Sequence, residues 1–310
     1  MSIPTLSSKL RSNFKIGVFD SGVGGLTVLR EMTAQMPNES FVYFGDTARV
    51  PYGNRSKSEI LRFVREIIAW MIEQEVKMIV MACNTSSALV LEEVRSEFPI
   101  PILGIILPGA KAAVKSGKRI GVVSTQATAD SNAYQQAVQE IEPTAEVWQV
   151  GCQEFVPLIE GDRIHDPYTL SVANRYLKPL VEAGIDTLVY GCTHYPHLAP
   201  VFKQILPNTI QLVDPAKYLT VAAMQELEIL RLRRSRTAAA SATTKDADNS
   251  KQQAFSQSTQ FYVSGHPQQF SQVSAQWLGY QPKVKKVAVQ TLEAIHAAPI
   301  TTDSTVRVSD

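Results

Sequence analysis

Short apolar runs alternate with segments of helical periodicity along most of the chain. The runs that predict buried strands are KIGVFD (15–20), SFVYFGD (40–46), KMIVMA (77–82), PILGII (101–106), RIGVVST (119–125), EVWQVG (146–151), TLVYG (187–191) and IQLVD (210–214). The segments between them have apolar residues at helical spacing, as at Ile60, Val64, Ile67 and Met71. Alternation of strand and helix predicts an α/β protein whose sheets are parallel and covered by helices on both faces.

One segment departs from this alternation. Residues 237–260 are rich in Ala, Ser, Thr and Gln and have almost nothing to bury, which predicts a disordered insertion. Ordered structure should return at QFYVSG (260–265), followed by a helix over residues 267–278.

A weak internal echo suggests two related halves. KMIVMACNTSS (77–87) and DTLVYGCTHYP (186–196) share an apolar strand, a small residue, a cysteine and then a threonine within two positions. We therefore predict that the two halves are related folds that face each other.

Composition and charge narrow the function classes. The 310 residues are 45% hydrophobic and 19% charged, which is the balance of a soluble globular protein. Thirty basic and 29 acidic residues leave a net charge of +1, so no global field draws the chain to nucleic acid or to an anionic membrane. The basic cluster RLRRSR (231–236) is interpreted as the last turn of a helix, where cations complement the dipole.

Cysteine use and the N-terminus predict a cytoplasmic protein. The chain has three cysteines without a close pair, which argues against a disulfide framework and for a reducing compartment. MSIPTLSSKLRSN lacks the apolar core of a secretory signal, and no apolar run reaches membrane-spanning length.

Four strand ends have chemically useful side chains. Asp20-Ser21-Gly22 follow the first strand, Asp46-Thr47 and Pro51-Tyr52-Gly53 the second, Cys83-Asn84-Thr85 the third, and Cys192-Thr193-His194 end a strand of the second half. In parallel sheets ligands bind at the carboxyl ends of the strands, so these side chains should project from the ligand-binding edge.

Several kinds of site could use these residues. DSGVGG lacks the third glycine of a dinucleotide fingerprint, because Thr27 stands there, and it fits better as a turn that brings backbone amides near a small ligand. Neither Cys83 nor Cys192 is followed by the arginine that a phosphate-cradling loop would need. Zinc on Cys83, Cys152, Cys192 and His194 would lack a close cysteine pair. A Cys-His hydrolase using Cys83 and His194 would leave the second thiol idle.

Two thiols at opposed strand ends fit a different reaction. Inverting a carbon centre requires a base on one face and an acid on the other, with the roles exchanged in the reverse direction. A free thiol has a pKa of about 8.5, so small changes in its surroundings yield either the thiol or the thiolate. Matched acid/base groups suit a symmetric reaction.

The motifs together resemble the bacterial glutamate racemases, within the wider family of cofactor-independent aspartate/glutamate racemases. The resemblance covers residues 14–290 and rests on FDSGVGGLTV (19–28), YFGDTARVPYG (43–53), MACNT (81–85), GIILPGA (104–110), FVPLIEG (155–161), YGCTHYP (190–196) and FYVSG (261–265). It implies that Cys83 takes the alpha proton from D-glutamate and that Cys192 takes it from L-glutamate. It also implies that Asp20 lies beside Cys83, and His194 with Glu160 near Cys192, as further catalytic residues. The resemblance further implies two similar parallel-sheet α/β domains with the active site between them. The predicted boundaries are 14–107 plus 212–290 for a discontinuous first domain, which contains the insertion, and 108–211 for the second.

The same resemblance implies a set of substrate contacts. The carboxylate and ammonium groups of glutamate would meet Ser21, Pro51, Tyr52, Gly53, Asn84, Thr85, Thr125, Thr128 and Thr193. The residues after Cys83 would then supply hydrogen bonds and a helix N-terminus for an anionic ligand. Cys152, outside any such motif, is interpreted as a core residue, and His197 as a surface residue.

The implied function is racemisation of glutamate to supply D-glutamate for cell-wall peptidoglycan. It needs no cofactor and no metal; glutamate is the small-molecule partner, a homodimer is allowed, and neither nucleic acid nor membrane is expected. The alternatives are a racemase for aspartate or another small amino acid, and a binding protein of this fold without catalysis. Leu107, where relatives often have a polar residue, leaves local specificity and regulation open.

Overall fold

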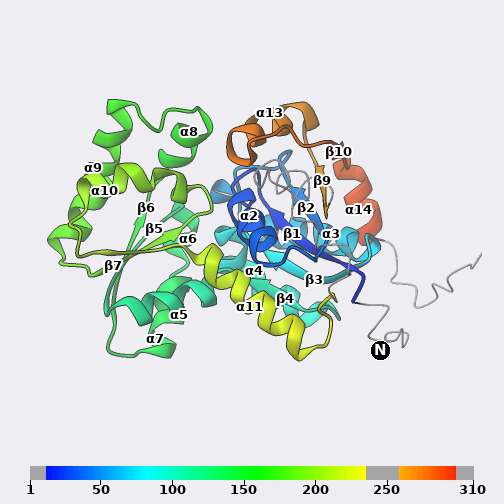
Figure 1. Ribbon diagram of the computed structural model, residues 1–310, viewed down its shortest axis with the longest axis horizontal. Coiled ribbons are helices and arrows are strands. Elements are labelled where there is room, and N and C mark those ends of the chain that lie inside the picture. The colour runs from blue at the N-terminus through cyan, green and yellow to red at the C-terminus, as the bar shows by residue number, and fades with distance from the viewer. Residues whose placement is uncertain (1–11, 235–257, 298–310) are drawn as a thin grey trace, which may run out of the picture.

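Two parallel β-sheets organise the chain, and each is covered by helices. The computed structural model describes residues 12–234 and 258–297, and Figure 1 shows the two sheets in separate lobes side by side. The predicted fold class, an α/β protein with two parallel-sheet domains, is confirmed. No helix in these two ranges combines the length and apolarity needed to cross a membrane.

The larger sheet has six strands in the order β10-β9-β2-β1-β3-β4, all parallel. The strands are β1 (Lys15–Asp20), β2 (Phe41–Gly45), β3 (Val76–Met81), β4 (Ile102–Gly104), β9 (Thr259–Val263) and β10 (Val284–Lys286). The central strands β1, β2 and β3 are buried almost throughout, as expected for a sheet covered on both faces.

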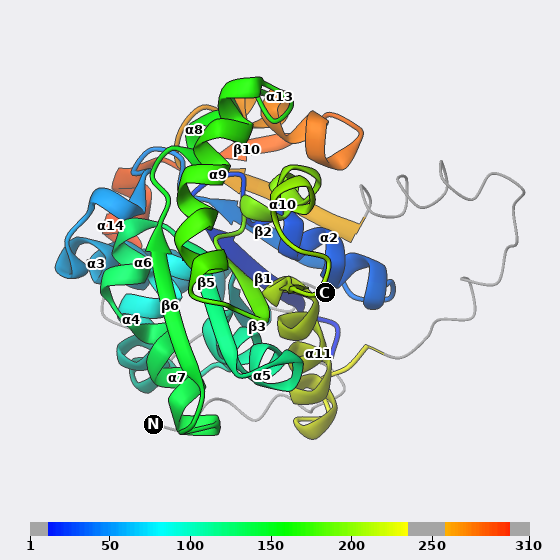
Figure 2. The same cartoon turned by 90° about the vertical axis from the view of Figure 1, so that its left-hand side faces the viewer.

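The smaller sheet has four parallel strands in the order β6-β5-β7-β8. They are β5 (Arg119–Ser124), β6 (Glu146–Gly151), β7 (Thr187–Gly191) and β8 (Gln211–Val213). Figure 2 looks onto the lobe that contains this sheet. We refer to the two lobes as the six-stranded and the four-stranded domain.

The helices follow the strands in the expected alternation. They are α2 (Leu26–Gln35), α3 (Lys57–Glu73), α4 (Asn84–Glu97), α5 (Ile106–Ser116), α6 (Gln126–Asp130), α7 (Ala133–Ile141), α8 (Phe155–Glu160), α9 (Pro167–Glu182), α10 (Ala199–Ile205), α11 (Pro215–Ile229), α13 (Pro267–Leu278) and α14 (Val289–Ala297), with short 3₁₀ turns η1 (Tyr52–Asn54) and η2 (Tyr195–Leu198). Local chemistry explains several ends. Ser56 and Glu59 form a capping box at the start of α3, and α13 ends at Gly279, whose φ of 76° favours glycine.

The chain crosses between the domains twice, and these crossings bear on the domain boundaries. It leaves the six-stranded sheet after β4 and enters α5; it returns after β8 through α11, which packs against both α5 and α2 (Figure 1). The domain boundaries given above stay a prediction. Leu212 and Val213, which that prediction assigns to the first domain, pair with β7 in the four-stranded sheet.

Three local expectations need correction. The run PILGII is a strand only to Gly104, because Ile106 already begins α5. The predicted insertion ends too late, since Thr259 and Gln260 belong to β9; residues 237–257 lie outside the described residues. The basic cluster does not lie in a helical turn, because α11 ends at Ile229 and Arg231 has a φ of 57°.

Candidate active site

The strand ends that precede the predicted site residues meet between the two domains. Asp20 ends β1 and Cys83 follows β3, so both lie at the carboxyl edge of the six-stranded sheet. Thr125 follows β5 and Cys192 follows β7, at the carboxyl edge of the four-stranded sheet. Hydrogen bonds between these groups, described next, bring the two edges together.

One set of contacts joins the β1–α2 turn to the end of β7. The Thr27 hydroxyl donates to the Thr193 carbonyl at 3.0 Å, and the Thr193 hydroxyl donates to the Asp20 carboxylate at 3.5 Å. Gly24 lies between them, and a Cβ there would come within 2.3 Å of Thr193 Oγ1 and 2.4 Å of His194 Nδ1. Glycine therefore allows the two domains to approach this closely.

A second set of contacts is a triangle of threonine hydroxyls. Thr85 of α4 lies 2.9 Å from Thr125 and 3.2 Å from Thr128, and the latter two are 3.0 Å apart. The Thr125 side chain also accepts from the Thr128 backbone amide and so caps α6. Three hydroxyls from two domains thus converge where a polar ligand could replace their mutual hydrogen bonds.

Opposing influences act on the Cys83 thiol. Burial and the nearby Asp20 carboxyl raise its pKa to about 11, although hydrogen bonds from Ser86, in the first turn of α4, and from Ser21 work against the rise. The Ser21 hydroxyl lies 3.9 Å from the sulfur. Burial also raises the pKa of Asp20, while His194 opposes that shift. Cys83 is therefore a protonated thiol at neutral pH, ready to donate.

Cys192 has a cationic partner instead. Its sulfur lies 3.8 Å from His194 Nδ1, and His194 Nε2 lies 2.9 Å from the Glu160 carboxylate. Burial opposes the charged imidazolium, but the Cys192 sulfur and Glu160 outweigh it and raise the His194 pKa to about 10. The imidazole is therefore protonated at neutral pH, which places a positive charge beside the Cys192 sulfur.

An aromatic side chain from the opposite domain covers this histidine. Trp277 of α13 packs edge-on against the His194 ring at 5.4 Å and lies over the His197 ring at 4.4 Å. His197 is thus half-buried, and the prediction of a surface residue is wrong. Burial, together with the charges of the neighbouring His194 and of Arg30, lowers its pKa to about 4, so His197 is neutral beside the charged His194.

A buried ionic network holds the loop between β2 and α3. Arg49 pairs with Asp46 and with Glu66 of α3, and the Tyr52 hydroxyl donates to Asp46. Ser264, after β9, also donates to Asp46 at 2.7 Å. The network fixes the loop on which Pro51, Tyr52 and Gly53 stand.

The predicted site residues are brought together, with differences in detail. Cys83 and Cys192 are 5% and 7% exposed, and the buried members of the predicted set are Asp20, Tyr52, Asn84, Thr85, Thr128, Thr193 and His194. Pro51 is exposed. The Tyr52 hydroxyl is engaged by Asp46, so its side chain supports the loop, whereas a Cβ on Gly53 would meet Thr125 at 3.6 Å. Cys152 is buried, which confirms its interpretation as a core residue.

Sequence reasoning missed three contributors to this interface: Tyr134, Thr27 and Trp277. Tyr134 donates to the Asn84 side chain at 2.7 Å. Thr27 and Trp277 make the interdomain contacts given above. Thr27 stands inside the motif FDSGVGGLTV and could have been singled out; Tyr134 and Trp277 have no local signal, because their partners are distant in sequence.

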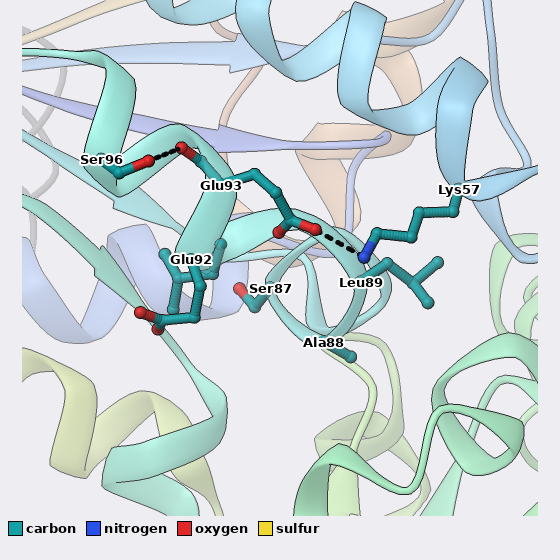
Figure 3. A pocket seen from close by; sticks show the side chains of 8 residues that line it. Lys57, Ser87, Ala88, Leu89, Glu92, Glu93 and Ser96 are labelled. Atoms are coloured by element: carbon teal, nitrogen blue, oxygen red, sulfur yellow. Dashed lines mark hydrogen bonds and ion pairs between the residues drawn. The ribbon is translucent and has the colours of Figure 1, made fainter.

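A separate hollow lies along α4. It has a volume of about 500 Å³, and Lys57 pairs with Glu93 at its rim (Figure 3). None of the predicted site residues lines it. The closed interface around Cys83 and Cys192, where the chemical groups converge, is the stronger candidate for the active site.

Comparison with known proteins now decides the family. A family model described as Asp/Glu/Hydantoin racemase matches residues 16–223. The chain belongs to this family. A curated glutamate racemase from Rippkaea orientalis is 61% identical over 277 residues, which cover 89% of this chain and 92% of that protein.

Solved structures agree with this relationship. A glutamate racemase isoform from Bacillus anthracis is 32% identical with a TM-score of 0.80, covering 90% of this chain and 98% of that one. The glutamate racemase from Francisella tularensis, solved in complex with D-glutamate, is also 32% identical, with a TM-score of 0.79 and coverage of 91% and 99%. The resemblance inferred from the motifs is confirmed.

Proposed function

We propose that this protein interconverts L- and D-glutamate by moving the alpha proton between two cysteines, without a cofactor. The observation that supports it best is the pair of buried thiols at opposed strand ends, each with its own set of polar partners. Such a pair supplies one acid/base group for each face of the alpha carbon.

The surroundings of the thiols suit opposite starting roles. Cys192, as a thiolate beside protonated His194, takes the alpha proton of L-glutamate, and the Cys83 thiol delivers its own proton to the other face. Cys83 is then the thiolate and Cys192 the thiol, which is the state that accepts D-glutamate. One proton leaves the substrate and one returns, so the charge of the thiol pair is conserved.

The remaining polar groups would hold the substrate and stabilise the carbanion. Asn84, Thr85 and Thr193 can donate to the carboxylates, and the N-terminus of α4 favours negative charge. The positive end of the α4 dipole is most valuable when the alpha proton leaves, because negative charge then spreads onto the alpha-carboxylate. Ser21, Gly53, Thr125 and Thr128 complete the proposed substrate contacts.

The proposed role is supply of D-glutamate for cell-wall peptidoglycan. This proposal follows from the glutamate racemases that the chain resembles. We expect the protein to work in the cytoplasm, where thiols stay reduced, and the expectations of a homodimer and of no nucleic-acid partner remain predictions.

Circular dichroism on L-glutamate and L-aspartate tests the proposal directly. Metal-free protein without pyridoxal phosphate should invert L-glutamate, and inversion should stop near equal amounts of the two enantiomers. If L-aspartate is inverted faster than L-glutamate, aspartate is the preferred substrate. Binding of glutamate without inversion would show a non-catalytic binding protein.

Cys152 provides a matched control for the two thiols. It is also a buried free cysteine, and burial raises its pKa, but its sulfur donates to the Val150 carbonyl, outside the proposed site. We expect Cys152→Ala to keep the wild-type rate within about twofold, since it removes no acid/base group. A large loss in a folded Cys152→Ala protein would contradict the assignment of the roles to Cys83 and Cys192.

A further inference from the structure

The side-chain amide of Asn84 is left half satisfied at the centre of the interface. Asn84 is the first residue of α4, directly after Cys83, and is 3% exposed. Its Oδ1 accepts a hydrogen bond from the Tyr134 hydroxyl at 2.7 Å. Its Nδ2 is buried, and no acceptor within the described residues pairs with it. A buried donor without an acceptor is unfavourable, and native proteins usually retain one for a reason.

Tyr134 comes from the opposite domain. It stands in the first turn of α7, in the four-stranded domain, and its side chain is fully buried. Its hydroxyl makes the Asn84 bond across 50 residues of sequence. Burial raises the Tyr134 pKa, and the charges of Asp214 and Cys192 add to the rise. The Asn84 amide, adjacent to Cys83 in sequence, is therefore held by a side chain of the opposite domain.

The hydrogen bond fixes which way the amide faces. Burial raises the Tyr134 pKa above its usual value, so the phenol keeps its proton and acts as a donor. In the structure the phenol donates to Oδ1, and the amide nitrogen of the same side chain can only donate. With Oδ1 engaged, Nδ2 points its two N–H groups elsewhere, as donors in need of an acceptor.

We propose that Tyr134 is a positioning residue, which orients Asn84 so that Nδ2 donates to a carboxylate of the substrate. The inference rests on the proposed function, since glutamate supplies the carboxylate. It adds a link between domain closure and substrate binding, because the hydroxyl and the amide come from different domains. The donor is aligned only when the two domains are together.

Steady-state kinetics of Tyr134→Phe provide the first test. The substitution removes one oxygen and keeps the ring, so Asn84 can rotate. We expect KM for both enantiomers to rise about tenfold while kcat changes by less than about threefold, as for a lost binding interaction. An unchanged KM, or a loss confined to kcat, would overturn the proposal.

A double-mutant cycle with Asn84→Ala shows whether Tyr134 acts through the amide. If it does, adding Tyr134→Phe to Asn84→Ala should change kcat/KM by less than about twofold, although each single substitution lowers it. A further loss in the double variant would mean that Tyr134 acts elsewhere. Should Tyr134→Phe alone fail to fold, the comparison of the double variant with Asn84→Ala still decides, because removing both partners leaves no unpaired group.

Tyr190→Phe is the matched control. Tyr190 is a buried tyrosine of the same domain whose hydroxyl has no partner among the described residues. Its loss should leave KM within about twofold of wild type, since no hydrogen bond is removed. A tenfold rise in KM for Tyr190→Phe would show that any buried phenol has this effect and would remove the support for Tyr134.

Glutamate binding separates this proposal from the proposed function. We would measure the rise in melting temperature on adding D-glutamate, which reports binding without turnover. Wild type that binds glutamate but does not invert it would refute the racemase function, while a smaller rise for Tyr134→Phe than for Tyr190→Phe would still support the positioning role. Equal rises in the two variants would overturn it.

Discussion

The two thiols differ at the scale of single residues. Cys83 lies beside a carboxyl group, and its pKa of about 11 makes it a donor at rest. Cys192 lies beside an imidazole whose pKa is raised to about 10, so a positive charge stands next to this thiol. Racemisation has an equilibrium constant of one, yet the two thiols that serve it lie in different surroundings. Each thiol must act as an acid in one direction and as a base in the other.

Solvent deuterium tests the division of labour between the thiols. In heavy water, inverted glutamate should contain deuterium at the alpha carbon from the first turnover, because one thiol removes the proton and the other delivers a different one. Cys83→Ala and Cys192→Ala should each lower racemisation by at least about 10²- to 10⁴-fold. Proton retention in early product, with activity left in one variant, would indicate a single swinging base.

The pH dependence of kcat/KM should reveal the ionisation of His194. Its pKa is raised, so the protonated form is present below about pH 10 and is lost as the pH rises through that value. We expect kcat/KM to fall on the alkaline side from about pH 10. The profile must be the same for both enantiomers, because the equilibrium constant is one at every pH.

His194→Asn tests the assignment of that alkaline limb. Asparagine keeps a polar side chain but does not titrate, so the limb should move toward about pH 11, where Cys83 loses its proton. The rate below pH 9 should also drop, since the Cys192 thiolate loses its cation. An alkaline limb that stays in place would assign it to another group.

At the scale of elements, an ionic network sets the shape of the β2–α3 loop. Arg49 is buried between Asp46 and Glu66, and its guanidinium also lies 4.2 Å from the centre of the Phe63 ring. Removing one member of a buried charge cluster leaves the others uncompensated, which is more costly than losing an exposed pair.

Arg49→Met should therefore destabilise the fold. The buried Asp46 would lose its cation and the buried Glu66 would keep only the half-exposed Arg62, so we expect the free energy of unfolding to fall by about 3 kcal/mol. Urea denaturation measures it. Arg62→Met on α3 is the control, because the Arg62 side chain is 51% exposed and its ion pairs should contribute less than about 1 kcal/mol. Equal losses in the two variants would show that burial of the network does not matter.

At the scale of the whole molecule, the site exists only between the domains. The six-stranded domain supplies Cys83 and Asp20, and the four-stranded domain supplies Cys192 and Thr125. Direct hydrogen bonds close the gap, including those from Thr85 to Thr125 and from Thr27 to Thr193. We expect substrate entry to require that the two domains separate, because these bonds and the buried thiols leave the site closed.

A crystal structure with glutamate bound would test this arrangement. If each sulfur approaches one face of the alpha carbon at about 3 to 3.5 Å, the Cys83 and Cys192 sulfurs should lie roughly 7 Å apart with the ligand between them. The threonine hydroxyls that now bond one another should turn toward the ligand. A separation above about 12 Å in a closed complex would argue against two-base chemistry.

The sequence alone determined most of the strands and helices and pointed to the candidate reacting groups. Strand and helix follow from apolar periodicity, a local property, and for that reason β1, β7 and α13 were predicted at their observed bounds. The short strand β10 and helix α14 were not predicted. The cysteines and hydroxyls stood out because they directly follow apolar strands, and topology places strand ends at one edge.

Only the tertiary structure decided which groups meet. Tyr134 bonds Asn84 across 50 residues, and Trp277 of α13 covers His194 of the other domain; no periodicity relates such pairs. The protonation states of Cys83 and His194 also depend on burial and on charges brought from other strands. The local sequence determines which functional groups are present. Their pKa values and their hydrogen-bond partners depend on distances between residues that only the folded chain sets.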